Sequence, residues 1–143
     1  MGPLNLPASG LVYVDANAII YAVEHVEPYF SLLAPLWTTS GPTSFQIATS
    51  ELTLLEVLVR PFKTGNTQLE AGFRRLLQQT GDVRLAPITQ AVLEVGARLR
   101  VTASLKTPDA IHAATALVEG FALFVTNDVA FRRIPGYECE GAA

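Results

Sequence analysis

The sequence predicts an α/β fold: a three-layer α/β/α sandwich whose mostly parallel central sheet is covered by helices on both faces. Short apolar runs alternate along the chain with longer segments whose apolar residues recur at helical spacing. The clearest runs, 11–14 and 121–125, are apolar throughout, which is typical of strands buried on both faces. Helices between successive strands favour parallel connections. We expect one domain over residues 1–143, with its core at about 10–140.

Capping residues set the boundaries of the expected elements. Ser50 can cap a helix that ends near Pro61. Thr107 followed by Pro108 indicates another helix start, with threonine as the N-cap and proline at the first helical position. Gly120 closes that helix. The expected strands are 11–14, 45–48, 83–86, 121–125 and one near 137–140, and the expected helices are 16–24, 28–39, 51–60, 67–79, 88–101, 107–119 and 129–133.

Composition excludes several classes of protein. Half of the residues are hydrophobic and 16% are charged, so the chain can bury a real core and is not intrinsically disordered. The single cysteine, Cys139, excludes a disulfide framework and a cysteine-ligated zinc site. No apolar run approaches the roughly 20 residues of a membrane-spanning helix, and no secretory signal opens the chain. We therefore expect a cytoplasmic protein without a membrane partner.

Two aspartates follow predicted strands directly. Asp15 comes after the strand at 11–14, and Asp128 follows the strand at 121–125 after Thr126 and an asparagine. Ligands of parallel sheets bind outside the carboxyl ends of the strands, so a site is expected where these two side chains lie. Taken alone, each aspartate is better explained as the N-cap of the next helix.

Two further acids fall in helices. Glu56 lies at the border of an apolar stripe, where a carboxylate needs a partner, a shifted pKa or a metal; Arg60, one turn on, is an alternative partner. Glu51 lies on another face and is expected to face solvent. Asp109, in the first turn of its helix, complements the helix dipole by about 0.3–1 kcal/mol. Alanines on the same helix would let it approach the strand ends closely.

Convergence of these four acids would create a repulsion that a divalent cation relieves. Carboxylate oxygens suit Mg²⁺, with Mn²⁺ as an alternative. Bound Mg²⁺ can activate water, act as a Lewis acid and orient a phosphate. We expect Asp15 and Asp109 as principal ligands, with Glu56 and Asp128 completing the shell directly or through water. Whether one ion or two would bind is left open.

Four segments resemble, in order, the sequence blocks of PIN domains, and they span nearly the whole chain. They are 14–20 (VDANAII), 50–58 (SELTLLEVL), 107–116 (TPDAIHAATA) and 124–131 (FVTNDVAF). The small size resembles the VapC-type toxins of toxin–antitoxin pairs. The resemblance implies a Mg²⁺-dependent ribonuclease, a homodimer, and a cognate antitoxin that blocks the active-site groove. It implies a catalytic and metal-binding acidic site with two supporting residues: Asp15, Glu56, Asp109 and Asp128, with Asn17 and Thr126.

Other residues have weaker functional interpretations. His112 lies one helical turn from Asp109 and invites a general acid–base role, but we interpret it as a core residue or a surface tip. Eight of the ten basic residues are arginines, which can grip phosphate with paired hydrogen bonds. Arg132 and Arg133 follow Asp128 closely and are the best candidates for contacts to RNA.

Two alternatives to a ribonuclease remain open. One is a catalytically silent PIN-like module that binds a partner protein. The other is a different metal-dependent phosphate-ester hydrolase, such as a haloacid-dehalogenase-like phosphatase. That chemistry uses an aspartate two residues after the nucleophilic aspartate, and the corresponding position here is Asn17. Mg²⁺-dependent RNA cleavage, with and without EDTA, separates the three.

Overall fold

A five-stranded parallel sheet organises the computed structural model, which describes residues 4–134 and 139–140. The strand order is β3-β2-β1-β4-β5, and every described pair of neighbours is parallel. The predicted parallel sheet is therefore confirmed. Its strands are β1 (Leu11–Val14), β2 (Gln46–Ser50), β3 (Val83–Ala86), β4 (Leu123–Val125) and β5 (Cys139–Glu140).

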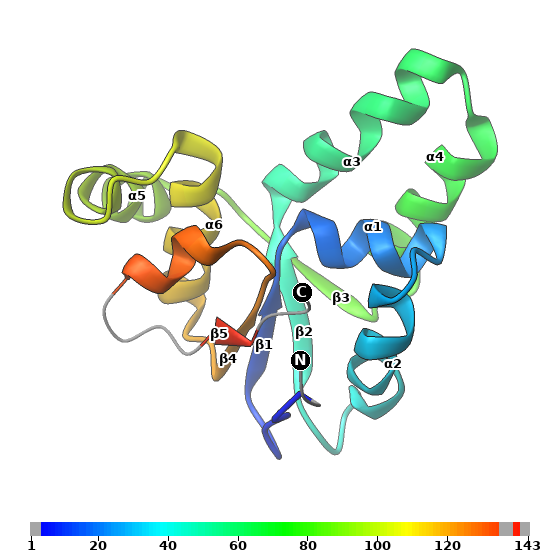
Figure 1. The fold of residues 1–143 in the computed structure, drawn as a ribbon, viewed down its shortest axis with the longest axis horizontal. Helices are drawn as coiled ribbons and strands as arrows, with labels where there is room; N and C mark the ends of the chain where they lie inside the picture. Colours follow the sequence, from blue (N-terminus) through cyan, green and yellow to red (C-terminus); the bar gives the residue numbers. More distant parts are fainter. Residues whose placement is uncertain (1–3, 135–138, 141–143) are drawn as a thin grey trace.

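Helices cover both faces of this sheet. Figure 1 shows α1 to α4 on one side and α5 and α6 on the other, which confirms the three-layer arrangement. No helix in the described ranges has the length and apolarity that a bilayer crossing requires. The helices are α1 (Ala16–Glu24), α2 (Tyr29–Thr39), α3 (Glu51–Thr64), α4 (Thr67–Arg74), α5 (Gln90–Thr102) and α6 (Thr107–Glu119), with a π-helical turn at Arg75–Gln79 and a 3-10 helix, η2, at Val129–Arg133.

The alternation of side chains along β1 divides the core in two. Val12 and Val14 pack into the larger cluster beneath α1 to α4, whereas Tyr13 packs into a second cluster beneath α5 and α6. Small side chains dominate the α6 side of that second cluster; Ala113 and Ala114 are both fully buried. Alanine at these positions lets α6 lie close to the sheet, where it contacts β2.

Helix boundaries differ from the prediction at two prolines. Helix α3 does not end near Pro61; it continues to Thr64 and closes at Gly65, whose φ is +66°. A proline removes only its own N–H, and the carbonyl of Pro61 still accepts from Gly65 N–H. At α6, the N-cap is Lys106 rather than Thr107, which is the first helical residue. The fixed φ of proline suits either of the first helical positions.

The remaining predicted elements agree with the described ones to within a few residues. The predicted strand at 121–125 begins only at Leu123. The predicted last strand is observed at Cys139–Glu140, and its residues 137 and 138 lie outside the described residues.

A candidate acidic active site

Asp15 and Asp128 both lie at the carboxyl edge of the sheet. Strands β1 and β4 are parallel neighbours with Val14 opposite Val125, so the residues that follow them leave the sheet together. Asp15 also caps α1, with Oδ1 accepting from Ala18 N at 3.3 Å. Asp128 caps η2, with Oδ1 accepting from Ala130 N at 2.9 Å. Each aspartate therefore both caps a helix and lies at the candidate site.

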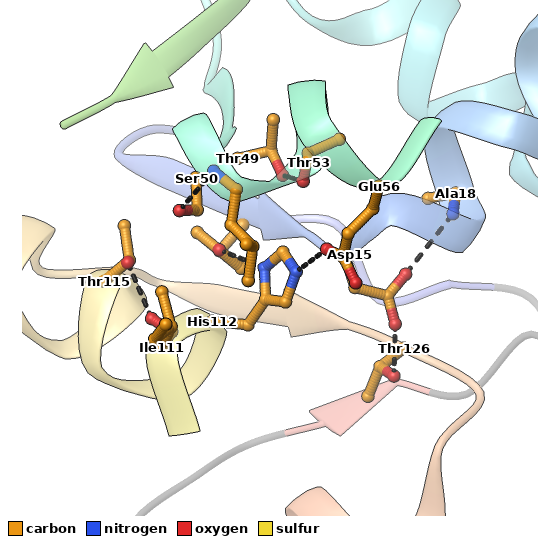
Figure 2. Close-up of polar contacts among 12 residues, drawn as sticks. Asp15, Ala18, Thr49, Ser50, Thr53, Glu56, Ile111, His112, Thr115 and Thr126 are labelled. Atoms are coloured by element: carbon orange, nitrogen blue, oxygen red, sulfur yellow. Dashed lines mark hydrogen bonds and ion pairs between the residues drawn. The ribbon is translucent and has the colours of Figure 1, made fainter. Parts of the chain in front are cut away.

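Thr126 connects these two aspartates. Its Oγ1 donates to Asp15 Oδ2 at 2.7 Å and accepts from Asp128 N–H at 3.0 Å (Figure 2 shows the first contact). The Thr126 side chain is buried, so water does not compete freely for these bonds. One hydroxyl therefore orients the Asp15 carboxylate and the backbone of Asp128 at once.

Burial dominates the electrostatics of Asp15. Only 7% of the residue is exposed, and this desolvation raises the pKa of its carboxyl group above the ordinary value. The Thr126 hydroxyl, the nearby His112 and the Ala18 amide lower the pKa, and the charge of Glu56 raises it again. Burying an acid here is costly, and the two hydrogen bonds offset only part of that cost.

Glu56 points from α3 toward the region of Asp15, as Figure 2 shows. Its Oε1 lies 2.6 Å from His112 Nε2, and 31% of its side chain is exposed. The alternative pairing of Glu56 with Arg60 is wrong, because Arg60 forms its ion pair with Glu24 of α1. Glu51 is exposed, as expected, and its Oε1 also accepts from Ile88 N–H at 3.0 Å.

His112 is the residue whose involvement the sequence did not predict. It is a buried residue, as expected, but its two ring nitrogens contact Glu56 and, at 2.7 Å, the hydroxyl of Tyr13. Two sequence signals pointed to it: its position one turn from Asp109, and the need of Glu56 for a partner at the edge of an apolar stripe. Neither identifies the pairing alone.

Asp109 lies in the first turn of α6, close enough to Asp128 and Glu56 for their charges to act on it. Burial is the largest cause that raises the pKa of its carboxyl group, followed by the charge of Asp128; Glu56 also raises it. His112 and Lys106 act in the opposite direction. These influences link Asp15 with Glu56, and Asp109 with both Glu56 and Asp128, so the four acids belong to one electronegative region.

The acids do not form a closed metal cage. Within residues 4–134 and 139–140, no three His, Cys, Asp or Glu side chains are grouped so as to hold an ion together. Convergence is therefore looser than the sequence predicted. Mg²⁺ usually takes one or two carboxylates and retains several waters, so it does not require such a cage. An all-oxygen donor set of mutually repelling carboxylates fits Mg²⁺ or Mn²⁺.

The supporting residues are placed unequally. Asn17 is exposed on the first turn of α1 and lines, with Asp15 and Thr126, a void of about 10 Å³. No hydrogen bond joins its side chain to the described residues, so its orienting role stays a prediction. Arg132 and Arg133 belong to η2, close after Asp128. Their side chains are not among those that the structure describes, so their contact with RNA also stays a prediction.

Comparisons with known proteins agree on the fold. The similar solved structures include VapBC2 from Rickettsia felis bound to a promoter DNA fragment, with TM-score 0.71 and 22% identity over 92% of this chain and 98% of that one. A toxin–antitoxin complex from Klebsiella pneumoniae gives TM-score 0.68 and 24% identity with the same coverage. The sarcin–ricin loop cleaving toxin VapC20 from Mycobacterium tuberculosis gives 0.65 and 16% over 79% of this chain and 86% of that one. No curated protein matches the chain.

A protein-family model matches most of the chain, including the acidic region. The PIN domain model matches residues 12–137, a span that includes all four acids, Thr126 and His112. The order of the sequence blocks, the parallel sheet and the acidic carboxyl edge agree with that match. The chain therefore belongs to the PIN domain family.

Proposed function

We propose that this protein is a metal-dependent endoribonuclease that cleaves RNA phosphodiester bonds, and that it is the toxin of a toxin–antitoxin pair. The observation that carries the proposal is a buried carboxylate, Asp15, held at the carboxyl end of β1 within range of Glu56. Asp109 completes the acidic region, and the charges of Asp128 and Glu56 raise the pKa of its carboxyl group. A cluster of acids that repel one another lowers the stability of the fold. A role in binding a cation that contacts substrate phosphate explains why the protein has such a cluster.

The residues divide the work of binding and orientation. Asp15 and Asp109 are the proposed principal ligands of Mg²⁺, and Glu56 and Asp128 complete its surroundings directly or through water. When bound, the ion supplies an activated water and offsets charge on the phosphate oxygens. Thr126 holds one oxygen of Asp15, so that carboxylate presents a fixed edge toward the site.

A protein partner is supported by surface chemistry and by the similar structures. Leu55, Val59 and Phe62 form an apolar stripe on α3, with exposed fractions of 63%, 43% and 58%. Exposed apolar patches of this kind mark interaction sites in many proteins. Because the similar structures include toxin–antitoxin complexes, we propose a cognate antitoxin and a homodimer as the partners, in the cytoplasm.

A catalytically silent binding module is the second candidate, and the exposed stripe on α3 favours it. Asp15 argues against it, since an uncharged residue such as asparagine would cap α1 equally well without the cost of burying a charge. The family match leaves the haloacid-dehalogenase-like alternative without support.

The decisive experiment is cleavage of a total RNA pool by purified protein. We expect cleavage with Mg²⁺, loss of cleavage with EDTA, and recovery on addition of excess Mg²⁺ or Mn²⁺. Asp15→Asn protein, shown to be folded by circular dichroism, is the matched control and should be inactive. Cleavage that survives EDTA or persists in Asp15→Asn protein would contradict the proposal.

A further inference from the structure

A chain of three polar side chains, two of them buried, leads from the sheet to the acidic region. It begins at Tyr13 in β1, passes through His112 in α6 and ends at Glu56 in α3. The Tyr13 hydroxyl lies 2.7 Å from His112 Nδ1, and His112 Nε2 lies 2.6 Å from Glu56 Oε1. Figure 2 shows the imidazole lying beside the Glu56 carboxylate. Three separate elements of the fold are joined by these two contacts.

The chemistry of the groups gives the direction of the second hydrogen bond. An ionised carboxylate only accepts hydrogen bonds, so His112 Nε2 carries the hydrogen and donates it to Glu56. The other ring nitrogen is then available to the Tyr13 hydroxyl. Such a bond on the second nitrogen fixes the orientation of an imidazole.

His112 is held too firmly, and buried too deeply, to meet a substrate. Only 3% of the residue is exposed. Tyr13 is fully buried, and its ring packs against Phe124 with a centroid separation of 5.0 Å. The imidazole therefore rests on a rigid base in the sheet. Glu56, in contrast, has a long flexible side chain that is partly exposed on its helix.

We infer that His112, braced by Tyr13, is a positioning residue that holds the Glu56 carboxylate in the acidic site. The functional part of this inference rests on the proposed function, since it is that function which gives Glu56 its role. Partners of this kind, one shell behind a metal ligand, typically change metal affinity or activity by about 10–100-fold when they are removed. A purely structural histidine would stabilise the core without any effect on Glu56.

Three variants separate the two roles. His112→Leu removes the donor, His112→Gln keeps an N–H near the position of Nε2, and Tyr13→Phe removes the brace. A matched control is Thr115→Val, at a buried polar residue on the same helix whose one side-chain hydrogen bond among the described residues goes to the Ile111 carbonyl. Thermal unfolding of each variant separates loss of fold from loss of positioning.

Mn²⁺ binding and Mg²⁺-dependent cleavage are the functional readouts. We expect His112→Leu to weaken Mn²⁺ binding and to raise the Mg²⁺ concentration for half-maximal cleavage by about 10–100-fold. His112→Gln should recover most of this loss, Tyr13→Phe should show a smaller one, and Thr115→Val none. In a Glu56→Ala background, His112→Leu should cause no additional loss, because its effect is transmitted through Glu56. Losses that multiply across the two substitutions would overturn the inference.

A spectroscopic readout keeps this inference separate from the proposed function. In nitrogen-15 spectra of the histidine rings, we expect a protected hydrogen on His112 Nε2 whose signal moves in Glu56→Ala protein and stays in place in Thr115→Val protein. This test needs neither RNA nor metal. If the wild-type chain cleaves no RNA and binds no Mn²⁺, the proposed function fails while the expected spectrum still supports the pairing. An Nε2 without hydrogen, or a signal indifferent to Glu56, overturns the pairing whatever the chain does to RNA.

Discussion

The strand side and the helix side of the acidic region are built differently. On the strand side, Asp15 lies at the end of β1, and hydrogen bonds from Ala18 and Thr126 occupy both of its carboxylate oxygens. On the helix side, Asp109 lies in the first turn of α6, and the charges of Asp128 and Glu56 oppose its ionisation. The strand side supplies a carboxylate fixed by two hydrogen bonds, whereas the helix-side carboxylate is opposed by two neighbouring acids.

The pKa values of the two aspartates shift in the same direction with different secondary causes. Burial is the largest cause in both. For Asp15 the next is the Thr126 hydroxyl, which lowers the pKa, and for Asp109 it is the Asp128 charge, which raises it. Both pKa values are raised, but removing the Thr126 hydroxyl should raise that of Asp15 further, whereas removing the Asp128 charge should lower that of Asp109. The Asp15, Thr126 and Asp128 variants below each test an effect on one side of the region against the other side.

Asp15→Asn should have the largest effect. The amide keeps an oxygen for Ala18 N–H but removes the fixed negative charge from the end of β1. With the loss of several kcal/mol of metal-dependent stabilisation, we expect RNA cleavage to fall by about 1,000-fold or more. The measurement is the initial rate of cleavage in Mg²⁺.

The fold of Asp15→Asn protein serves as the control for this result. Because a neutral side chain avoids the cost of burying charge, the free energy of unfolding in EDTA should be retained at neutral pH. A folded variant that cleaves RNA at the wild-type rate would remove Asp15 from the site.

Thr126→Val should have the next largest effect, on the strand side alone. The substitution leaves Asp15 Oδ2 and Asp128 N–H without their common partner, and a lost buried hydrogen bond costs about 1–3 kcal/mol of unfolding free energy. The pKa of Asp15 should rise further, because the hydroxyl lowers it. Urea unfolding and carboxyl carbon-13 titration measure the two effects. Thr126→Ser, which keeps the hydroxyl, should resemble wild type in both.

The strand side was also the more predictable from sequence. An aspartate directly after an apolar strand is fixed by the backbone, so the positions of Asp15 and Asp128 followed from the rule for parallel sheets. The partners of Glu56 did not follow from any local rule. His112 lies 56 residues after Glu56 in sequence, and Tyr13 lies 99 residues before His112. Only packing of α3, α6 and β1 brings them together.

Boundaries of the fold show the same contrast between local and tertiary control. Helix α1 agrees with the predicted 16–24: Asp15 caps its start, and His25 in the left-handed conformation follows its last residue. Helix α3 was predicted too short, because Pro61 is buried within the packed helix and does not stop it. Proline is a local signal that packing can override.

Asp128→Asn should act on the helix side. Asparagine is as good an N-cap as aspartate, so η2 keeps its cap while the charge near Asp109 disappears. The pKa of Asp109 should fall toward its ordinary value of 3.8, and that of Asp15 should stay unchanged, because Asp128 is not among its causes. Carboxyl carbon-13 titration in EDTA measures both values. A parallel change at Asp15 would show that the two sides are not independent.

The same variant makes a prediction about stability against pH. A carboxyl group whose pKa is raised in the folded state binds more protons there than in the unfolded chain. Its contribution is therefore most favourable below 3.8 and is lost as pH rises through the folded pKa. Asp128→Asn should relieve part of this loss. The variant should gain stability relative to wild type at about pH 7 and lose this advantage toward about pH 4. An advantage that grows toward low pH would contradict the assignment.

Arg60→Gln should have the smallest effect. It tests whether Arg60 or His112 is the hydrogen-bonding partner of the Glu56 carboxylate. Arg60 pairs with Glu24, and its side chain is 62% exposed. Exposed ion pairs contribute about 0.2–1 kcal/mol, so urea unfolding should reveal a loss in that range or none. Cleavage should stay within about twofold of wild type, a change below about 0.5 kcal/mol, because Glu56 keeps its bond to His112. A loss as large as that of Glu56→Ala would mean that Arg60, rather than His112, holds this carboxylate when the protein acts on RNA.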